Sequence, residues 1–436
     1  MNYKISDDTM VVQQSSNETI EESKLHKVGT LIETSFIKEF TPVYFVSIMG
    51  TGICSNILYN YSYPADWLRI CSYIAFALAL LFFASTTVFF CIACYKYPAK
   101  IQQYHFNSSI SVFMGCYCMG FTTIINFLSN LVVELPGGPI GIWVLWWINN
   151  FMSLYCACVI VYCSFFSKVM NEHRKEIDPS ELHATLLLPI VTLMVSSSSG
   201  NLLVPHLTSK TLQVITLVFC FVLWSNAVVI SFILTTIYFW KLVVYKIPPT
   251  NLVFTSFLPI GFLGQGGYGI LLFGKNCYDL LGKDELTPHY LKYIDFEKVD
   301  SDQLRLVLGN IFLLTSSMAS FILVSFGYFM TFIAVVSCLA KIKPFAKTTN
   351  PKFAYSGYIK FNKAFWAMTF PLGTMALANT EIERIFGEGF VFFRVVGCIY
   401  LIALIIITMI CVLGAIVKGV SRVRAVLKVE TIENKV

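Results

Sequence analysis

Long apolar stretches, separated by short polar segments, recur along the chain after residue 40. Ten of them reach the ~20 residues that a helix needs to cross a bilayer. They begin near Thr41, Trp67, Ser108, Gly141, Ala184, Thr211, Val253, Leu304, Phe361 and Gly389. The pattern predicts an all-α polytopic membrane protein with ten transmembrane helices.

Polar segments flank this apolar region at both ends. We expect a polar N-terminal tail over 1–40, a ten-helix transmembrane transporter domain over 41–418 and a C-terminal tail over 419–436. An even number of crossings places both tails on one side. An acidic segment from Lys275 to Gln303 separates the seventh and eighth stretches on the other side.

The odd-numbered stretches differ from the even-numbered ones in residue type. Four odd stretches contain a proline followed by small residues, whereas the even ones are mostly Phe, Leu, Val and Ile. A proline at membrane depth frees backbone carbonyls that only protein or water can satisfy. We therefore predict five helical hairpins, with the odd helices around a central pore and the even helices facing lipid. The alternative is that the small residues only allow close helix packing. The predicted kinks lie at Pro42, Pro189, Pro259 and Pro371.

Composition and charge agree with a membrane protein. Hydrophobic residues make up 56% of the chain, charged residues 13%, and the mean hydropathy is +0.69. The net charge of +6 comes from basic residues in short loops, so we expect a lipid bilayer and no nucleic acid as partner. Their distribution predicts that both termini are cytoplasmic. The fourteen cysteines fall in apolar stretches, except Cys277, which we expect in a loop.

Motifs that carry enzyme chemistry are missing from the sequence. We find no phosphate-binding loop, no zinc-protease motif and no nucleophile elbow, and we expect no enzyme activity, metal or cofactor. The interiors of the apolar stretches hold no Asp or Glu, and all six histidines lie in loops or at stretch ends. Cation carriers usually need such groups inside the membrane, so a cation pathway is disfavoured.

An anion pathway needs hydrogen-bond donors and positive helix ends, which hydroxyls and broken helices provide. Hydroxyls recur at helical spacing on the odd stretches, although each could instead bond to its own backbone. Lys363 lies at the expected cytoplasmic mouth, where it could concentrate anions. The predicted pore-lining residues are Ser47, Thr51, Ser55, Gly115, Thr192, Ser196, Ser199, Gly267 and Thr374.

Two nearby segments, Gly50–Tyr59 and Tyr63–Tyr73, resemble the opening of the fungal plasma-membrane sulfite efflux pumps. Further segments resemble the wider tellurite-resistance and dicarboxylate transporter family, which includes the slow anion channels of plant guard cells. These are Trp146–Trp147, Leu187–Val191 and Phe365–Pro371. The resemblance covers about residues 38 to 420.

This resemblance implies a ring of five hairpins with a central pore. It also implies that Phe370 is the pore gate, because the family places a phenylalanine there in a Trp-Ala-x-x-Phe stretch; Phe365 replaces the first residue of the family's Trp-Trp pair. The implied function is efflux of sulfite or bisulfite across the plasma membrane. Malate or C4-dicarboxylate transport, or a broader small-anion channel, is the alternative, and proton antiport stays open. Relatives form homotrimers, and a dimer stays open as well.

Overall fold

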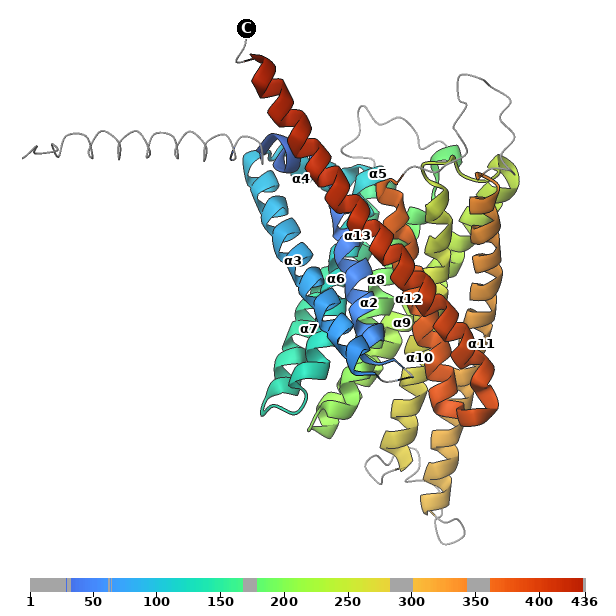
Figure 1. Ribbon diagram of the computed structural model, residues 1–436. Coiled ribbons are helices and arrows are strands. Elements are labelled where there is room, and N and C mark those ends of the chain that lie inside the picture. The colour runs from blue at the N-terminus through green and yellow to red at the C-terminus, as the bar shows by residue number, and fades with distance from the viewer. Residues whose placement is uncertain are drawn as a thin grey trace, which may run out of the picture.

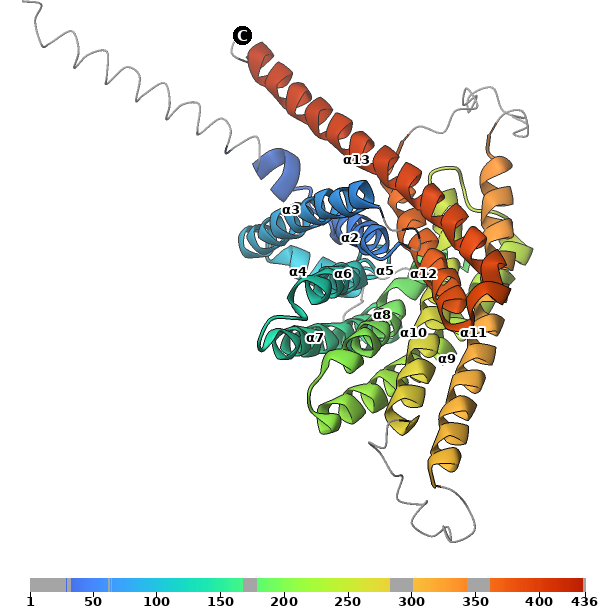
Figure 2. The ribbon, with the colours of Figure 1, turned by 60° about the horizontal axis from the view of Figure 1, so that its bottom comes forward.

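The computed structural model describes residues 29, 33–61, 63, 65–167, 179–282, 301–342 and 361–433. All regular elements in these ranges are helices, and the long ones form an inner and an outer layer (Figures 1 and 2). The inner layer contains α2 (Val46–Tyr59), α6 (Met114–Val132), α8 (Leu188–Leu203), α10 (Leu258–Gly282) and α12 (Thr369–Phe386). The outer layer contains α3 (Asp66–Lys96), α7 (Gly138–Leu154), α9 (Lys210–Tyr245), α11 (Ser301–Leu339) and α13 (Val391–Glu433). The predicted fold class and the alternation of inner and outer helices are confirmed.

Nine stretches of the described residues are long and apolar enough to cross a membrane. Each begins within three residues of one of the first nine predicted starts. The last stretch, Lys363–Arg422, contains both α12 and α13, and the chain turns between them at Gly387, where φ is +75°. Length and hydropathy therefore give nine spans where the sequence predicted ten, because these criteria join two helices into one stretch.

The two layers differ sharply in burial. In the inner spans that end before residue 282, between 67% and 94% of the most apolar window is buried inside the protein, against 17% to 39% in the outer spans. The inner helices are thus surrounded by protein, and the outer ones present their side chains to lipid.

Four of the five inner helices are extended at their N-terminal end by a 3-10 segment, and α2, α8 and α12, with 14 to 18 residues, are short for a membrane crossing. The 14 residues of α2 span ~21 Å and the four of η2 (Pro42–Phe45) add ~8 Å, which together match the ~30 Å hydrocarbon core. Three other inner helices follow 3-10 segments in the same way. These are η6 (Ala184–Leu187), η8 (Val253–Phe257) and η11 (Lys363–Met368). The inner layer is therefore built from a repeated unit.

The four predicted kink prolines lie where these units begin. Pro42 opens η2, Pro189 and Pro259 are the second residues of α8 and α10, and Pro371 is the third residue of α12. A proline costs little in the first turn of a helix, where its missing N–H has no intrahelical acceptor. The structure thus corrects the expectation of kinks within long helices: Pro42 begins a 3-10 segment, and the other three prolines lie in the first turn of an α-helix that follows one.

Glycines allow the inner helices to approach one another closely. A Cβ at Gly264 of α10 would lie 2.7 Å from the backbone N of Met375 in α12. A Cβ at Gly115 of α6 would lie 2.7 Å from the carbonyl oxygen of Leu188 in α8. Neither contact leaves room for a side chain. The close-packing alternative therefore applies to these glycines.

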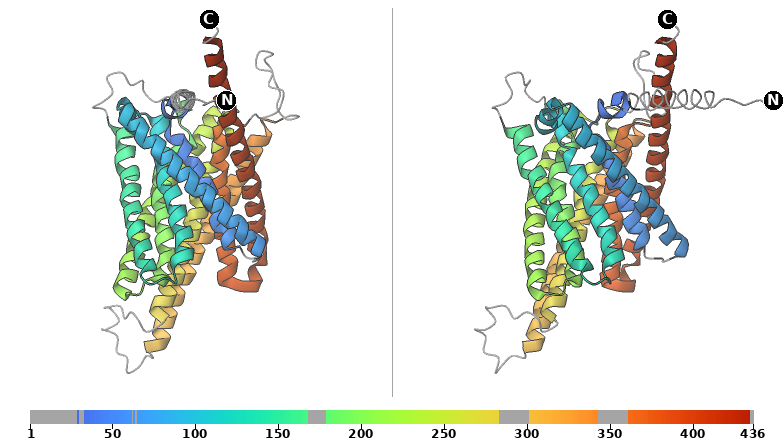
Figure 3. Two further views of the ribbon diagram at one scale, coloured as in Figure 1. Left: turned by 60° about the vertical axis from the view of Figure 1, so that its left-hand side comes forward. Right: turned by 90° about the vertical axis from the view of Figure 1, so that its left-hand side faces the viewer.

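Four outer helices, α3, α9, α11 and α13, are longer than the bilayer is thick. The 31 residues of α3 span ~46 Å and the 43 of α13 span ~64 Å, about 1.5 to 2 times the hydrocarbon core. Figure 1 shows α13 crossing the bundle obliquely, and Figure 3 shows the same for α3. The facing ends of α10 and α11 project beyond the other helices (Figure 3). The acidic segment predicted between them lies largely outside the described residues.

The described parts of the two predicted tails adjoin the helical bundle. Phe36 stacks on Phe89 of α3 with ring centroids 6.0 Å apart, and Glu33 forms an ion pair with Lys96 at 2.9 Å. At the other end, α13 continues past residue 418 to Glu433. The segment that precedes α2 contacts α13 through Arg422, which pairs with Glu39 at 3.4 Å and donates to the Tyr44 hydroxyl at 3.1 Å. We call this side of the bundle, beyond which α13 extends in Figure 1, the terminal side; the opposite side is the distal side.

All fourteen cysteines are free thiols. Most lie within helices, in line with their interpretation as small apolar residues. Cys277 corrects one expectation, because α10 extends to Gly282 and the residue is buried in that helix, not placed in a loop.

Candidate functional site

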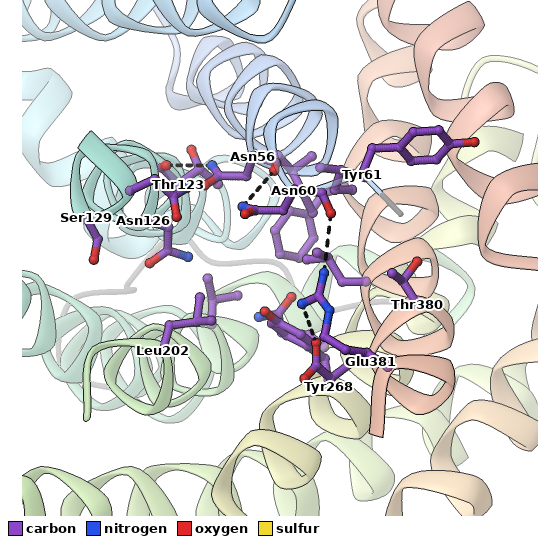
Figure 4. A pocket seen from close by; sticks show the side chains of 18 of the residues that line it. Asn56, Asn60, Tyr61, Thr123, Asn126, Ser129, Leu202, Tyr268, Thr380 and Glu381 are labelled. Carbon is purple, nitrogen blue, oxygen red and sulfur yellow. Dashed lines mark hydrogen bonds and ion pairs between the residues drawn. The ribbon is translucent and has the colours of Figure 1, made fainter. Parts of the chain in front are cut away.

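Two cavities lie along the inner layer, one toward each side of the bundle. The distal cavity, of about 140 Å³, is lined by residues of all five inner helices (Figure 4). The terminal-side cavity, of about 480 Å³, is lined mainly by the segments that precede these helices. They share no lining residue. Two separate cavities along one inner layer are the arrangement expected of a closed pathway.

Apolar side chains separate the two cavities. Phe370 lines the distal cavity from the start of α12 and is 4% exposed. Its ring lies against Gly261 of α10, where a Cβ would come within 3.7 Å of Phe370 Cδ1. On the facing ends of the two cavities, the walls contain Met49, Leu188 and Leu258 on the terminal side and Ile53 and Val195 on the distal side. An apolar constriction of this kind opposes passage of a hydrated ion.

Amide groups from three inner helices line the distal cavity (Figure 4). Asn56 Nδ2 donates to the carbonyl oxygen of Thr123 at 2.8 Å, which ties α2 to α6. Asn126 accepts a hydrogen bond from Ser199 at its Oδ1, so its NH₂ group is left to donate toward the cavity. Gln265 Nε2 donates to Ser198 at 2.6 Å. Asn56 Nδ2 also donates to the carbonyl oxygen of Gly52, so both of its amide hydrogens are used within the protein. The uncharged donors left for an anion are therefore those of Asn126 and Gln265.

A guanidinium and a carboxylate also line the distal cavity. Arg384 Nη1 donates to Glu381 Oε2 at 2.9 Å, and Nη2 donates to the carbonyl oxygen of Asn60 at 3.4 Å (Figure 4). The Glu381 side chain is 3% exposed, whereas that of Arg384 is 48% exposed. The expectation that no Asp or Glu lies inside a membrane helix was therefore wrong, because α12 continues past Thr380 to Phe386.

Basic and polar groups line the terminal-side cavity. Lys363, in η11, lines its wall with its Nζ 4.0 Å from the centre of the Tyr44 ring. A cation–π contact of this length holds the ammonium while leaving its hydrogens able to bind anions. His183, Thr185 and Thr255 lie in the same wall.

Residues 39–416 match the SLAC1 family of voltage-dependent anion channels. The chain belongs to this family. Its membrane helices and its relatives identify it as a multi-pass membrane protein. Two cavities lined by amides and basic side chains, with an apolar layer between them, agree with the anion transport typical of this family.

Fungal sulfite efflux pumps are similar to this chain over most of its length. A sulfite efflux pump of Candida albicans is 43% identical over 392 residues, covering 89% of this chain and 76% of the relative. A sulfite efflux pump of Saccharomyces cerevisiae is 35% identical over 402 residues, covering 83% and 84%. One of Arthroderma benhamiae is 29% identical over 371 residues, covering 84% and 86%.

The nine predicted pore-lining residues are all described, and none lies in the wall of the distal or the terminal-side cavity. Five hydroxyls instead donate to a carbonyl three or four residues earlier in their own helical segment. They are Ser47, Thr51, Ser55, Thr192 and Thr374. This is the local bonding that the sequence left open as their alternative.

The other four predicted residues lie between helices of this anion channel fold. Ser196 donates to Asn150 Oδ1 of α7 at 2.5 Å. Gly267 faces α11, where a Cβ would lie 2.9 Å from Val324 Cγ2, and Gly115 packs on α8. Ser199 reaches the pathway indirectly, since its hydroxyl orients Asn126.

Arg384 and Glu381 were missed because ~20 residues counted from the predicted start at Phe361 end near Thr380, whereas α12 continues to Phe386. Phe370, Leu377, Glu381 and Arg384 are spaced by seven, four and three residues, and all four line the distal cavity. This spacing keeps side chains on one face of an α-helix. Following the helix face that carries Phe370 and Leu377 for two more turns leads to Glu381 and Arg384.

Proposed function

We propose that this chain exports sulfite or bisulfite from the cytoplasm across the plasma membrane, through the pathway that joins the terminal-side and distal cavities. One observation carries the choice of anion: the two relatives at 43% and 35% identity, which align with most of this chain, are named sulfite efflux pumps. The role is transport, and no step of it needs a catalytic group.

Basic residues support an orientation with the terminal side in the cytoplasm. They flank the helices at that side, as expected for cytoplasmic loops and tails. Those in the described ranges are Lys38, Lys96, Lys100, Lys241, Lys246, Lys341, Lys363, Lys418, Arg422, Arg424 and Lys428. Both termini would then be cytoplasmic, and the distal cavity would open outward.

Phe370 acts in this proposal as the gate. Its ring is buried between the two cavities, and the apolar layer around it would exclude an anion until the ring moves. Once the gate opens, the membrane potential drives export, because each negative charge that leaves across ~100 mV gains ~2.3 kcal/mol. Lys363 would raise the local anion concentration at the cytoplasmic entrance.

Malate or another C4-dicarboxylate is the second candidate substrate. A dicarboxylate needs a cationic anchor, and Arg384 beside the distal cavity could supply one. The names of the relatives still favour sulfite. The same transport assay therefore has to include both anions.

The number of subunits is part of the proposal. We propose a homotrimer on the resemblance to the family alone. Each chain would keep its own pathway, since all five inner helices of one chain line the distal cavity. Native mass spectrometry of the protein in detergent distinguishes a trimer from a dimer.

Sulfite export from proteoliposomes tests the function. Vesicles preloaded with sulfite, chloride or malate are given a fixed potential with valinomycin and potassium, and the pH gradient is varied independently. We expect potential-dependent loss of sulfite that does not occur in protein-free vesicles. Loss of malate that follows the proton gradient, with sulfite retained, would reject the proposal in favour of a dicarboxylate carrier.

A further inference from the structure

Lys241 is a buried cation on an outer helix. It is 3% exposed and continues the stripe of α9 that faces the inner layer, after Thr235 and Tyr238. Its Nζ lies 2.9 Å from Nδ1 of His183. Among the side chains that the structure describes, no carboxylate lies within ion-pair distance of this ammonium.

Among the described side chains, this burial leaves a positive charge without a compensating negative one. A neutral imidazole satisfies one of the three ammonium hydrogens but supplies no counter-charge. Burying a charged group costs free energy unless a group of opposite charge and hydrogen bonds compensate it. The site is therefore electrostatically suited to an anion that arrives from elsewhere.

The contact with Lys241 also fixes the protons on His183. Because Nδ1 accepts from the ammonium, the proton of the neutral ring must be on Nε2, which becomes a hydrogen-bond donor. Burial, aided by the charge of Lys241, lowers the pKa of His183 to about 4, so the ring stays neutral near pH 7. His183 lines the terminal-side cavity, and among the described residues its Nε2 has no hydrogen-bond partner.

We propose that Lys241 and His183 form an oxyanion-recognition site in the wall of the terminal-side cavity, with the Nε2–H of His183 donating to one oxygen of the anion and Lys241 supplying the charge behind it. The proposal rests on the proposed function and names the groups that select its substrate. Lys363 lines the same cavity and adds a second positive charge to its wall. Chloride would also be attracted by the positive charge, but it would gain less from the directional N–H donor of His183.

Transport kinetics provide the first test. We would measure the terminal-side sulfite concentration for half-maximal export by the full chain and by Lys241→Met and His183→Leu. Loss of a charge-assisted hydrogen bond should raise this concentration about tenfold or more, with a smaller change in maximal rate. His183→Gln keeps an N–H donor at a similar reach and should stay closer to the wild type. Lys246→Met is the matched control, since Lys246 is exposed and bonds only to the Val243 carbonyl.

Histidine NMR provides a second test that does not depend on transport. In protein labelled with ¹³C and ¹⁵N histidine, the resonance lost in His183→Gln should report the Nε2–H tautomer and should shift when sulfite is added. Lys241→Met should abolish the single tautomer. A half-saturating concentration in Lys241→Met and His183→Leu equal to that of Lys246→Met would overturn the proposal, as would a His183 signal that sulfite does not move. Failure of the wild type to export sulfite would instead reject the proposed function, whereas the NMR titration would still report on the site.

Discussion

The inner and outer helices of this chain have different surroundings, protein around the inner ones and lipid around the outer ones. The inner helices are the more buried and yet the less hydrophobic, whereas the outer helices are the most apolar and the most exposed. A soluble protein shows the opposite trend. In a bilayer the outer surface must match hydrocarbon, while the interior can hold polar groups if their hydrogen bonds are made internally. The comparison explains why the pathway lies in the less hydrophobic helices.

Side-chain size separates the two layers as clearly as polarity does. Glycine brings inner helix backbones close enough to touch, as at Gly264 and Gly115. Outer helices instead carry large exposed side chains, such as Phe332 of α11 and Phe392 of α13. Close packing lets the inner layer hold a narrow barrier in place, and the outer layer can tolerate substitution. Variants placed on each layer test this division.

The largest effect should come from the inner phenylalanine. Phe370→Ala removes the ring between the two cavities and should raise anion conductance by about tenfold or more, which corresponds to lowering the barrier by ~1.4 kcal/mol. Patch recordings or sulfite flux at fixed potential measure the change. Phe332→Ala makes the same truncation at a residue that is 67% exposed and should leave conductance unaltered. An unchanged or lower conductance for Phe370→Ala at normal surface expression would rule out the gate.

Arginines on the two layers give the next comparison. Arg384→Gln leaves the buried Glu381 carboxylate without its partner at the distal cavity, and this charge should repel an anion. We expect sulfite flux to fall about tenfold, equivalent to ~1.4 kcal/mol. The double variant with Glu381→Gln should recover part of the loss. Arg394→Gln on α13 breaks a pair with Glu383 at 3.4 Å outside the cavity and should have little effect. Equal losses in the two arginine variants would show that the pair acts through stability only.

Adding one methyl group tests the packing of the two layers. Gly264→Ala would place a Cβ 2.7 Å from backbone atoms of α12 and should cost ~1–3 kcal/mol, because backbone cannot move aside as a flexible side chain can. Gly141→Ala on α7 meets nothing within 4 Å and should stabilise the helix by ~0.5–1 kcal/mol. Thermal unfolding in one detergent, followed by circular dichroism, measures both. Similar midpoints for the two variants would argue against a tightly packed inner layer.

Sequence patterns predicted the layers well and the site less well. Stretch lengths and the contrast between small and bulky residues were enough to assign inner and outer helices, since lipid exposure acts on composition directly. The pore-lining residues depended on which face of each inner helix is turned to the axis, and a helix buried on all sides, such as α8, has no polar face that marks this direction. Arg384 and Lys241 were missed as site residues because a charge near a helix end suggests a loop or snorkelling until the neighbouring helices are known.

The smallest expected effect is a change with pH in the unfolding temperature, caused by the contact between His183 and Lys241. His183 precedes inner helix α8, Lys241 belongs to outer helix α9, and the pKa of His183 falls from 6.5 to about 4 in the folded protein. The fold thus favours the neutral ring, so the stability it contributes is present above pH 6.5 and is lost as pH falls toward 4. The unfolding temperature of the wild type should therefore drop more steeply between pH 7 and 4.5 than that of His183→Gln. Because partial exposure of the ring weakens the effect, we expect a difference of a few degrees or less. Parallel curves for the two proteins would mean that Lys241 and the surrounding burial do not hold His183 neutral.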